Sequence, residues 1–262
     1  MKQRIITALA IIATVFPLIY FFPFWGLRAV ILVFSALAVY EITAIIDKRI
    51  PLLGIIGVYL MVLVLSFCWE QNYVVFLGLF IVLLFTIDVL YSFIDITRIA
   101  YLFLMTLMFS TAIRGLIQAN VMFGFTGVMF VFVVTYLCDS AAYFIGRRFG
   151  KHKLIPKVSP NKTVEGAIGG FLVSFIAGVV YLYIWSQFNN GMAVFIAACI
   201  TMPLTGQIGD LAFSSIKRHF NQKDFGSIFP GHGGALDRID SLLFNFMVFH
   251  VILMFYNYLV TR

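Results

Sequence analysis

The sequence predicts an all-α, polytopic integral membrane protein with about nine transmembrane helices and a cytosolic N-terminus. Of its 262 residues, 62% are hydrophobic and only 11% are charged, whereas charged residues make up about 25% of a typical soluble domain. The mean hydropathy is +1.03. Because the apolar residues fall into runs long enough to cross a bilayer, we interpret residues 1–262 as a single transmembrane helical domain.

Each span is predicted from an apolar run of roughly 17–25 residues, the length that a helix needs to cross the hydrocarbon core. The chain begins Met1-Lys2-Gln3-Arg4, like a signal peptide. No small-residue cleavage site follows, so we expect an uncleaved first helix. The predicted spans are Ile5–Phe22, Gly26–Ile46, Leu52–Trp69, Tyr73–Phe93, Ile99–Ile117, Val121–Cys138, Gly166–Ser186, Gly191–Ile208 and Ser241–Val260.

The basic residues predict the orientation of these spans. The chain has 18 Lys and Arg against 11 Asp and Glu, a net charge of +7. In a membrane protein such an excess marks the cytosolic side rather than a nucleic-acid site, and we expect no nucleic-acid partner. With the N-terminus inside, only Arg28, Arg114 and Arg262 lie outside. Both long polar segments, 139–165 and 209–240, then face the cytosol.

The first polar segment carries an anion-binding pattern. Asp139 follows the sixth span, Glu165 opens the seventh, and glycines stand at expected turn positions, Gly146 and Gly150. In the stretch 159–163 we expect a Ser-Pro turn, with Lys162 and Thr163 at a helix start, which offers hydroxyls, N–H groups and an ammonium to a bound anion. A basic loop that only touches anionic lipid headgroups is the alternative, but lipid adhesion requires neither the acids nor the glycines.

The second polar segment brings acids to helix ends. Asp210 closes the eighth span, while Asp237 and Asp240 are three residues apart and so share one helix face. Ion pairs with Lys or Arg are one use for each acid. For the set we favour Mg²⁺, which is held by one or two carboxylates together with substrate phosphates. Asp210 and Asp237 are the main candidate ligands, and Asp240 and Asp139 are further ones.

Three further acidic and basic residues stand apart from this set. His232 stands among glycines in Pro230-Gly231-His232-Gly233-Gly234, where the backbone can approach a ligand closely. We assign it to binding, with a structural loop role as the alternative. Glu41 and Asp88 lie near the cytosolic ends of their spans, and we expect them to pair with Lys48, Arg49 or the basic loops.

The second polar segment contains a long pattern of residues: Ser214, Ile216, Lys217, Arg218, Lys223, Asp224, Gly226, Phe229, Pro230, His232, Gly233, Gly234, Asp237, Arg238, Ile239 and Asp240. The first segment contains Asp139, Tyr143, Gly146, Gly150, Ser159-Pro160, Lys162-Thr163 and Glu165-Gly166. Together these residues resemble the phosphatidate cytidylyltransferases, also called CDP-diacylglycerol synthases. The departures are Ala235, where the family has a larger aliphatic residue, and Asn161, where a Lys is common.

The resemblance implies that CTP and phosphatidate give CDP-diacylglycerol and pyrophosphate for phospholipid synthesis, with Mg²⁺. It leaves room for a second, monovalent cation and suggests a homodimer, which the sequence itself does not show. We expect the catalytic region in 139–241, on the cytosolic face of a bacterial inner membrane. The candidate catalytic residues are Asp210, Asp237, Lys223 and Arg238. The candidate substrate-binding residues are Ser159, Lys162, Thr163, Lys217, Arg218, His232, Gly233 and Gly234.

Two other functions would fit a chain of this hydropathy. A lipid-alcohol kinase would use the same interface and metal, but it would release a nucleoside diphosphate rather than pyrophosphate. A transporter would place its acids near the bilayer midplane on broken helices. Here the acids cluster at helix ends on one predicted side, which argues against a transporter, and analysis of the products would separate the kinase from a nucleotidyl transferase.

Overall fold

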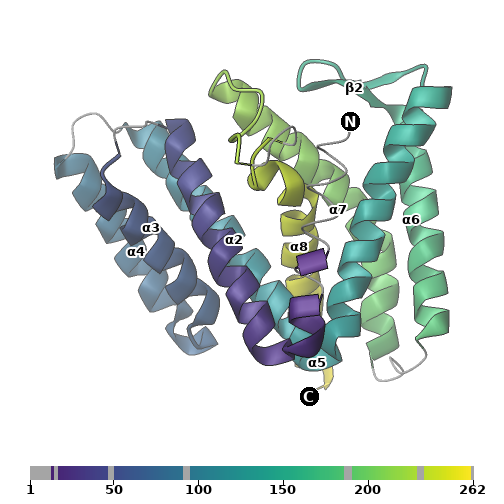
Figure 1. Ribbon diagram of the computed structural model, residues 1–262, viewed down its shortest axis with the longest axis horizontal. Coiled ribbons are helices and arrows are strands. Elements are labelled where there is room, and N and C mark those ends of the chain that lie inside the picture. Colours follow the sequence, from purple (N-terminus) through teal and green to yellow (C-terminus); the bar gives the residue numbers. More distant parts are fainter. Residues whose placement is uncertain are drawn as a thin grey trace. The chain divides into compact units, whose positions relative to one another are not determined.

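The computed structural model describes residues 13–14, 17–46, 50–90, 95–185, 191–228 and 233–260. Apart from one short hairpin, the described elements are helices, which confirms the all-α polytopic class (Figure 1). Among the described residues, six helices are long and apolar enough to cross a membrane, and Leu52–Phe67 is a shorter apolar helix. The first predicted span lies largely outside the described residues, and the number nine stays a prediction.

The chain groups into two compact units. One contains Met1–Arg114 and Asp224–Arg238, and the other contains Gly115–Lys223 and Ile239–Arg262. Each unit is therefore built from segments that are distant in sequence. The organisation as a single domain stays a prediction.

In the first unit, three helices follow one another along the chain: α2 (Pro23–Ile46), α3 (Leu52–Phe67) and α4 (Glu70–Leu90). α3 contacts both of the others (Figure 1). The guanidinium of Arg114 donates to the carbonyl oxygens of Leu65 and Cys68, at 3.1 and 2.9 Å. These carbonyls lie at the C-terminal end of α3, where backbone acceptors have no partner within the helix, so Arg114 closes that end.

The long helix α5 (Ile96–Phe149) combines two predicted spans, 99–117 and 121–138. Its backbone breaks at Gly124, with φ 64° and ψ −160°. Positive φ is accessible to glycine at little cost, so the kink falls here. The sequence placed the interruption at 118–120, which is wrong: those residues are helical.

In the second unit, α6 (Val164–Ile184) packs closely against α5 and contacts α7 (Met192–His219). A Cβ added to Gly166 or Gly170 would lie within 3 Å of backbone atoms of α5. One turn further along, the Ser174 hydroxyl donates to the Val134 carbonyl at 2.7 Å. Small residues every four positions let helix backbones approach in this way inside a membrane.

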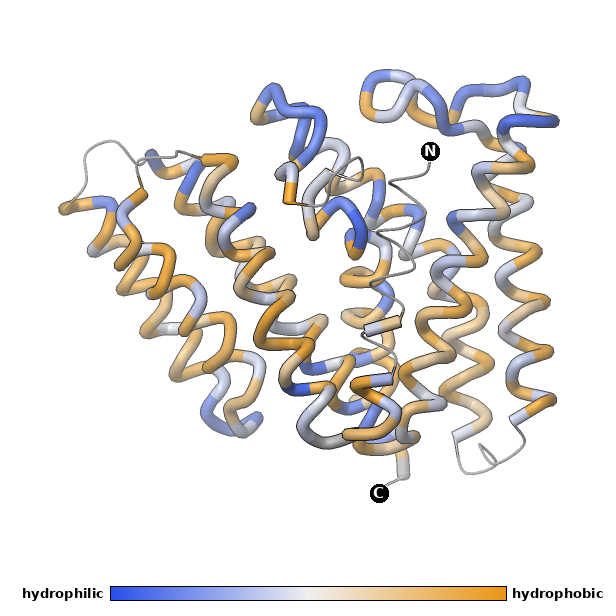
Figure 2. Tube along the Cα trace, viewed as in Figure 1, coloured by the Kyte–Doolittle hydropathy of each residue, from blue (hydrophilic) through white to orange (hydrophobic). Residues whose placement is uncertain are grey.

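The helices extend beyond the predicted spans. α5 continues through Asp139 to Phe149, α7 continues through Asp210 to His219, and α8 (Leu236–Val260) begins before Ser241. The hydrophilic residues of the second unit gather at these extensions and at the hairpin (Figure 2). The apolar run ends where the chain leaves hydrocarbon, but a helix has no reason to end there. Much of both predicted loops is therefore helical.

A hairpin of β1 (Lys153–Ile155) and β2 (Ser159–Thr163) leads into α6. The strands are antiparallel, with Lys153 opposite Thr163 and Ile155 opposite Ser159. The turn lies at 156–158, so the prediction of a turn at Ser159-Pro160 is wrong. Gly146 is likewise helical rather than part of a turn. A Cβ there would lie 2.8 Å from Thr163 Oγ1, so it allows α5 to approach the start of α6.

Candidate active site

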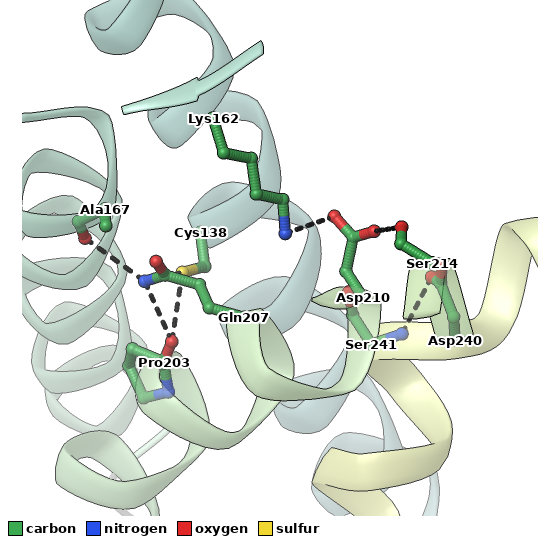
Figure 3. A network of polar contacts seen from close by, with 9 residues as sticks. All are labelled: Cys138, Lys162, Ala167, Pro203, Gln207, Asp210, Ser214, Asp240 and Ser241. Atoms are coloured by element: carbon green, nitrogen blue, oxygen red, sulfur yellow. Dashed lines mark hydrogen bonds and ion pairs between the residues drawn. The ribbon is translucent and has the colours of Figure 1, made fainter. Parts of the chain in front are cut away.

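An ion pair joins the two polar segments within the second unit. Lys162 Nζ lies 2.6 Å from Asp210 Oδ2, and the Ser214 hydroxyl donates to Asp210 Oδ1 at 3.4 Å (Figure 3). Lys162 is on β2, whereas Asp210 and Ser214 are one turn apart on α7. The Lys162 side chain is 26% exposed and that of Asp210 is 33% exposed. The pair is therefore reachable by a water-soluble ligand.

Two further carboxylates lie near Asp210. Asp139 and Asp240 both repel the charge of Asp210, while Lys162 attracts Asp139 and Lys217 attracts Asp240. Asp139 is on α5 and Asp240 is in the first turns of α8, where its Oδ1 accepts the Ser241 N–H at 2.8 Å (Figure 3). Three helices thus bring one acid each within electrostatic range of the others, and two lysines offset their negative charge in part.

A glutamine one turn before Asp210 holds α7 against α6. Gln207 lies one turn before Asp210, and its Nε2 donates to the Ala167 carbonyl of α6 at 3.1 Å and to the Pro203 carbonyl at 3.0 Å (Figure 3). Pro203 has no N–H to continue the helical ladder. Gln207 therefore ties α7 to α6 one turn before Asp210, which helps to fix the point from which Asp210 projects.

The predicted metal ligands are divided between the two units. Asp139, Asp210 and Asp240 belong to the second unit, and Asp237 belongs to the first. Asp237 Oδ2 accepts the N–H groups of Phe225 and Gly234 at 2.9 and 3.0 Å. Asp237 therefore joins the backbone at Phe225 to the backbone at Gly234, just before α8, and its pairing with Asp210 at one metal stays a prediction.

In the part of the chain that the structure describes, no group of three or more His, Cys, Asp or Glu side chains is arranged to hold a metal ion by itself. The donors present suit Mg²⁺ in another way, since it is usually bound by one or two carboxylates together with substrate phosphates and water. The partly exposed Asp210, with the nearby charges of Asp139 and Asp240, matches this chemistry. The residues thus fit a magnesium ion that arrives with a polyphosphate.

The predicted anion-binding residues of the hairpin have different neighbours. Lys162 points to Asp210, whereas Thr163 is buried and its Oγ1 accepts the Gly166 N–H at 3.2 Å as the N-cap of α6. Ser159 lies on β2 beside the turn. Glu165 accepts the N–H groups of Lys151 and His152, and it lies 2.7 Å from His152 Nδ1. Thr163 and Glu165 thus hold the hairpin, and Lys162 is the member that reaches the acids.

The other predicted basic residues lie around the end of α7 and the start of α8. Arg218, Lys223 and Arg238 are exposed, and Lys217 is half-buried. Arg218 donates to the Gln222 carbonyl at 3.1 Å. Gly233 adopts φ 84°, and Gly234 is buried. His232 lies outside the described residues, so its assignment stays a prediction.

Sequence reasoning missed the use of Glu41. This residue of α2 is 1% exposed, and its Oε1 and Oε2 accept the N–H groups of Ala235 and Leu236 at 2.8 and 2.9 Å. We expected Glu41 to pair with Lys48, Arg49 or a basic loop, but it binds the start of α8. Lys48 and Arg49 lie outside the described residues. A lone acid in an apolar helix carries no local signal for such a distant partner.

Fold and site together define a class: a polytopic helical membrane protein whose helix ends hold carboxylates and lysines. A family model described as the cytidylyltransferase family matches residues 2–256, and the chain belongs to this family. It is 45% identical over 126 residues to a protein of Staphylococcus haemolyticus and 46% identical over 126 residues to one of Staphylococcus saprophyticus. Over 130 residues it is 42% identical to one of Staphylococcus epidermidis.

All three relatives are named phosphatidate cytidylyltransferase. The first two alignments each cover 48% of this chain and 48% of the relative, and the third covers 50% of each. The chain therefore spans about half the length of the curated relatives it matches. The sequence resemblance to this family is confirmed.

Proposed function

We propose that the protein transfers a cytidylyl group from CTP to phosphatidate, which gives CDP-diacylglycerol and pyrophosphate. A phosphate oxygen of phosphatidate attacks the α-phosphorus of CTP. The bond between this phosphorus and the oxygen that bridges to the β-phosphorus breaks, and pyrophosphate leaves with the electron pair. The family match across residues 2–256 and the names of the relatives support this reaction.

The observation that carries the proposal is the ion pair between Lys162 of the hairpin and Asp210 in the polar extension of the apolar helix α7. One substrate has acyl chains that stay in lipid, and the other is a water-soluble polyanion. They meet only at the boundary, where their negative charges repel each other. Catalysis then consists mainly of charge neutralisation and in-line positioning of the two phosphates.

Basic residues would bind the phosphates, and acidic residues would hold the magnesium ion. Lys162, Lys217 and the exposed Arg218, Lys223 and Arg238 would bind the CTP phosphates and the leaving pyrophosphate. Asp210, with Asp139, Asp240 and Asp237 as further candidates, would hold Mg²⁺. When bound, the ion would neutralise charge on the phosphates. Since a phosphate monoester is mostly dianionic near neutral pH, with a second pKa of about 6, its oxygen needs no protein base.

We place the site on the cytosolic face of a bacterial plasma membrane. The excess of Lys and Arg in the predicted inner segments supports this orientation, and the staphylococcal relatives support the bacterial setting. A homodimer, which the family suggests, stays part of the proposal, and the proposal leaves room for a second, monovalent cation.

The proposal is tested with purified protein, CTP labelled in the cytidine ring, phosphatidate and Mg²⁺. We expect label in a chloroform-soluble product. Diacylglycerol, the substrate type of a lipid-alcohol kinase, should give no labelled lipid in place of phosphatidate. If all cytidine label stays in the aqueous phase with wild-type protein, the proposed function is wrong.

A further inference from the structure

Glu41 is a buried carboxylate that the reaction described above does not use. It lies in the apolar helix α2, and its side chain is 1% exposed. An acid in such surroundings is unfavourable unless strong hydrogen bonds meet it. Glu41 has them, because Oε1 accepts the Ala235 N–H at 2.8 Å and Oε2 accepts the Leu236 N–H at 2.9 Å.

These two N–H groups belong to the start of α8. The first N–H groups of a helix have no partner within it and carry partial positive charge. A cap normally comes from the residue just before the helix, but here it comes from another helix, about 195 residues away in the chain. Charge-assisted bonds of this kind are shorter and stronger than neutral ones.

Two glycines that precede α8, Gly226 and Gly234, leave room for this carboxylate. A Cβ on Gly226 or on Gly234 would collide with the carboxylate of Glu41. For Gly226, the three nearest atoms within 4 Å all belong to Glu41. The two glycines therefore leave the space that the acid fills, and either one as alanine would push it out of place.

Asp237 accepts hydrogen bonds from two other backbone N–H groups that precede α8. Its Oδ2 accepts those of Phe225 and Gly234, and Phe225 is buried. Glu41 and Asp237 thus hold different backbone atoms at the start of α8, all within the first unit. The same turn carries Arg238, whose N–H donates to the Ala235 carbonyl at 3.1 Å and which the proposed function assigns to the CTP phosphates.

We propose that Glu41 is a positioning residue for nucleotide binding: it anchors the first turn of α8 through Ala235 and Leu236, so that Arg238 in the same turn is fixed before CTP arrives. This inference rests on the proposed function for its ligand, CTP, but not for the anchoring itself. Glu41 touches no reacting atom and acts through Ala235 and Leu236.

The first test compares Glu41→Gln with wild type. The glutamine amide has one acceptor oxygen, so it can accept only one of the two N–H groups of Ala235 and Leu236. Its NH₂ group would face the other N–H, and that hydrogen bond is lost. We expect KM for CTP to rise and kcat/KM for CTP to fall at least about tenfold, since small misplacements near a reacting group have effects up to about 100-fold. KM for phosphatidate should stay within about twofold. Asp88→Asn, another acid within an apolar helix, is the matched control and should behave as wild type.

Hydrogen–deuterium exchange separates this inference from the proposed function. In Glu41→Gln, peptides that cover 233–238 should exchange faster, while those of α6 should not change. If wild type makes no CDP-diacylglycerol but the exchange result holds, the anchor stands and the proposed function fails. If wild type is active and Glu41→Gln shows normal exchange, or faster exchange with an unchanged KM for CTP, the inference is overturned.

If Glu41→Gln does not fold, Gly226→Ala tests the anchor by itself. It should raise KM for CTP, because its methyl group displaces the Glu41 carboxylate, and an unchanged KM would overturn the inference. If Glu41 variants do fold, the carboxylate is gone in a Glu41→Ala background, and Gly226→Ala should add little further loss there. If the two substitutions are additive, the glycine and the acid act independently, and the inference is wrong.

Discussion

Lys162 on β2 forms a 2.6 Å ion pair with Asp210 on α7, and this contact unites the two polar segments of the chain. The pair is partly exposed, so its contribution to stability is about 0–1 kcal/mol. Its location among Asp139, Asp240 and Lys217 indicates a different use. A lysine that neutralises an acid without substrate can turn to a phosphate once a cation binds the acid.

Lys162→Ala should lower kcat/KM for CTP by about 100-fold or more, the usual effect of removing one well-placed donor to a developing charge. The thermal unfolding midpoint in detergent should change little, because the ion pair is 26% and 33% exposed on its two sides. Lys153→Ala, an exposed lysine on the partner strand β1, is the matched control. If both variants lose equal activity, Lys162 has no specific role.

Asp210→Asn should raise the Mg²⁺ concentration needed for half-maximal activity and lower kcat, because the amide keeps the shape but loses the charge that attracts the ion. The measurement is a magnesium titration at saturating CTP. Asp95→Asn, which alters an exposed acid beside Arg98, should leave the titration unchanged. An Asp210→Asn enzyme with the wild-type magnesium dependence would remove this residue from the metal site.

Thr163 should act on stability rather than on substrate binding. Its hydroxyl caps α6, so Thr163→Val should destabilise the protein by about 1 kcal/mol, and Thr163→Ser should not. The readouts are the thermal unfolding midpoint and KM for CTP. A large increase in KM for Thr163→Val with an unchanged midpoint would show instead that the hydroxyl binds phosphate.

Close packing of α5 and α6 gives a prediction outside the site. Gly170→Ala would place a methyl group 2.8 Å from the Cys138 carbonyl oxygen and from Ala142 Cβ, and overpacking of this kind costs about 1–3 kcal/mol. Gly78→Ala in α4 adds the same methyl group where nothing lies within 4 Å. We expect a lower unfolding midpoint for Gly170→Ala alone. Equal midpoints would contradict the close approach of the two helices.

Much of the fold could be predicted from the sequence because lipid imposes a simple rule on composition and length. The apolar runs located the helices, but they could not locate their ends, since α7 continues past Asp210 where the hydropathy falls. Hydropathy also gave no sign of the hairpin. The stretch Ser159–Thr163 has turn-forming residues, yet pairing with Lys153–Ile155 makes it a strand.

Some residues of the candidate site left a local pattern in the sequence. Lys162 and Asp210 stood out as polar residues at span ends, and the structure brings them together. Glu41 left no such pattern, because its partners at 235 and 236 are backbone atoms far along the chain. The two small residues at 226 and 234 were its only trace in the sequence, and they became interpretable once the acid was found beside them.

No measurement bears on the proposed reaction more directly than following two phosphorus labels in CTP. With phosphatidate and Mg²⁺, label in the α-phosphate should enter the lipid, and label in the γ-phosphate should leave as pyrophosphate. Lipid that carries the γ-label would show a kinase, and lipid that carries neither label would show that the chain transfers no part of CTP. Either result would contradict cytidylyl transfer.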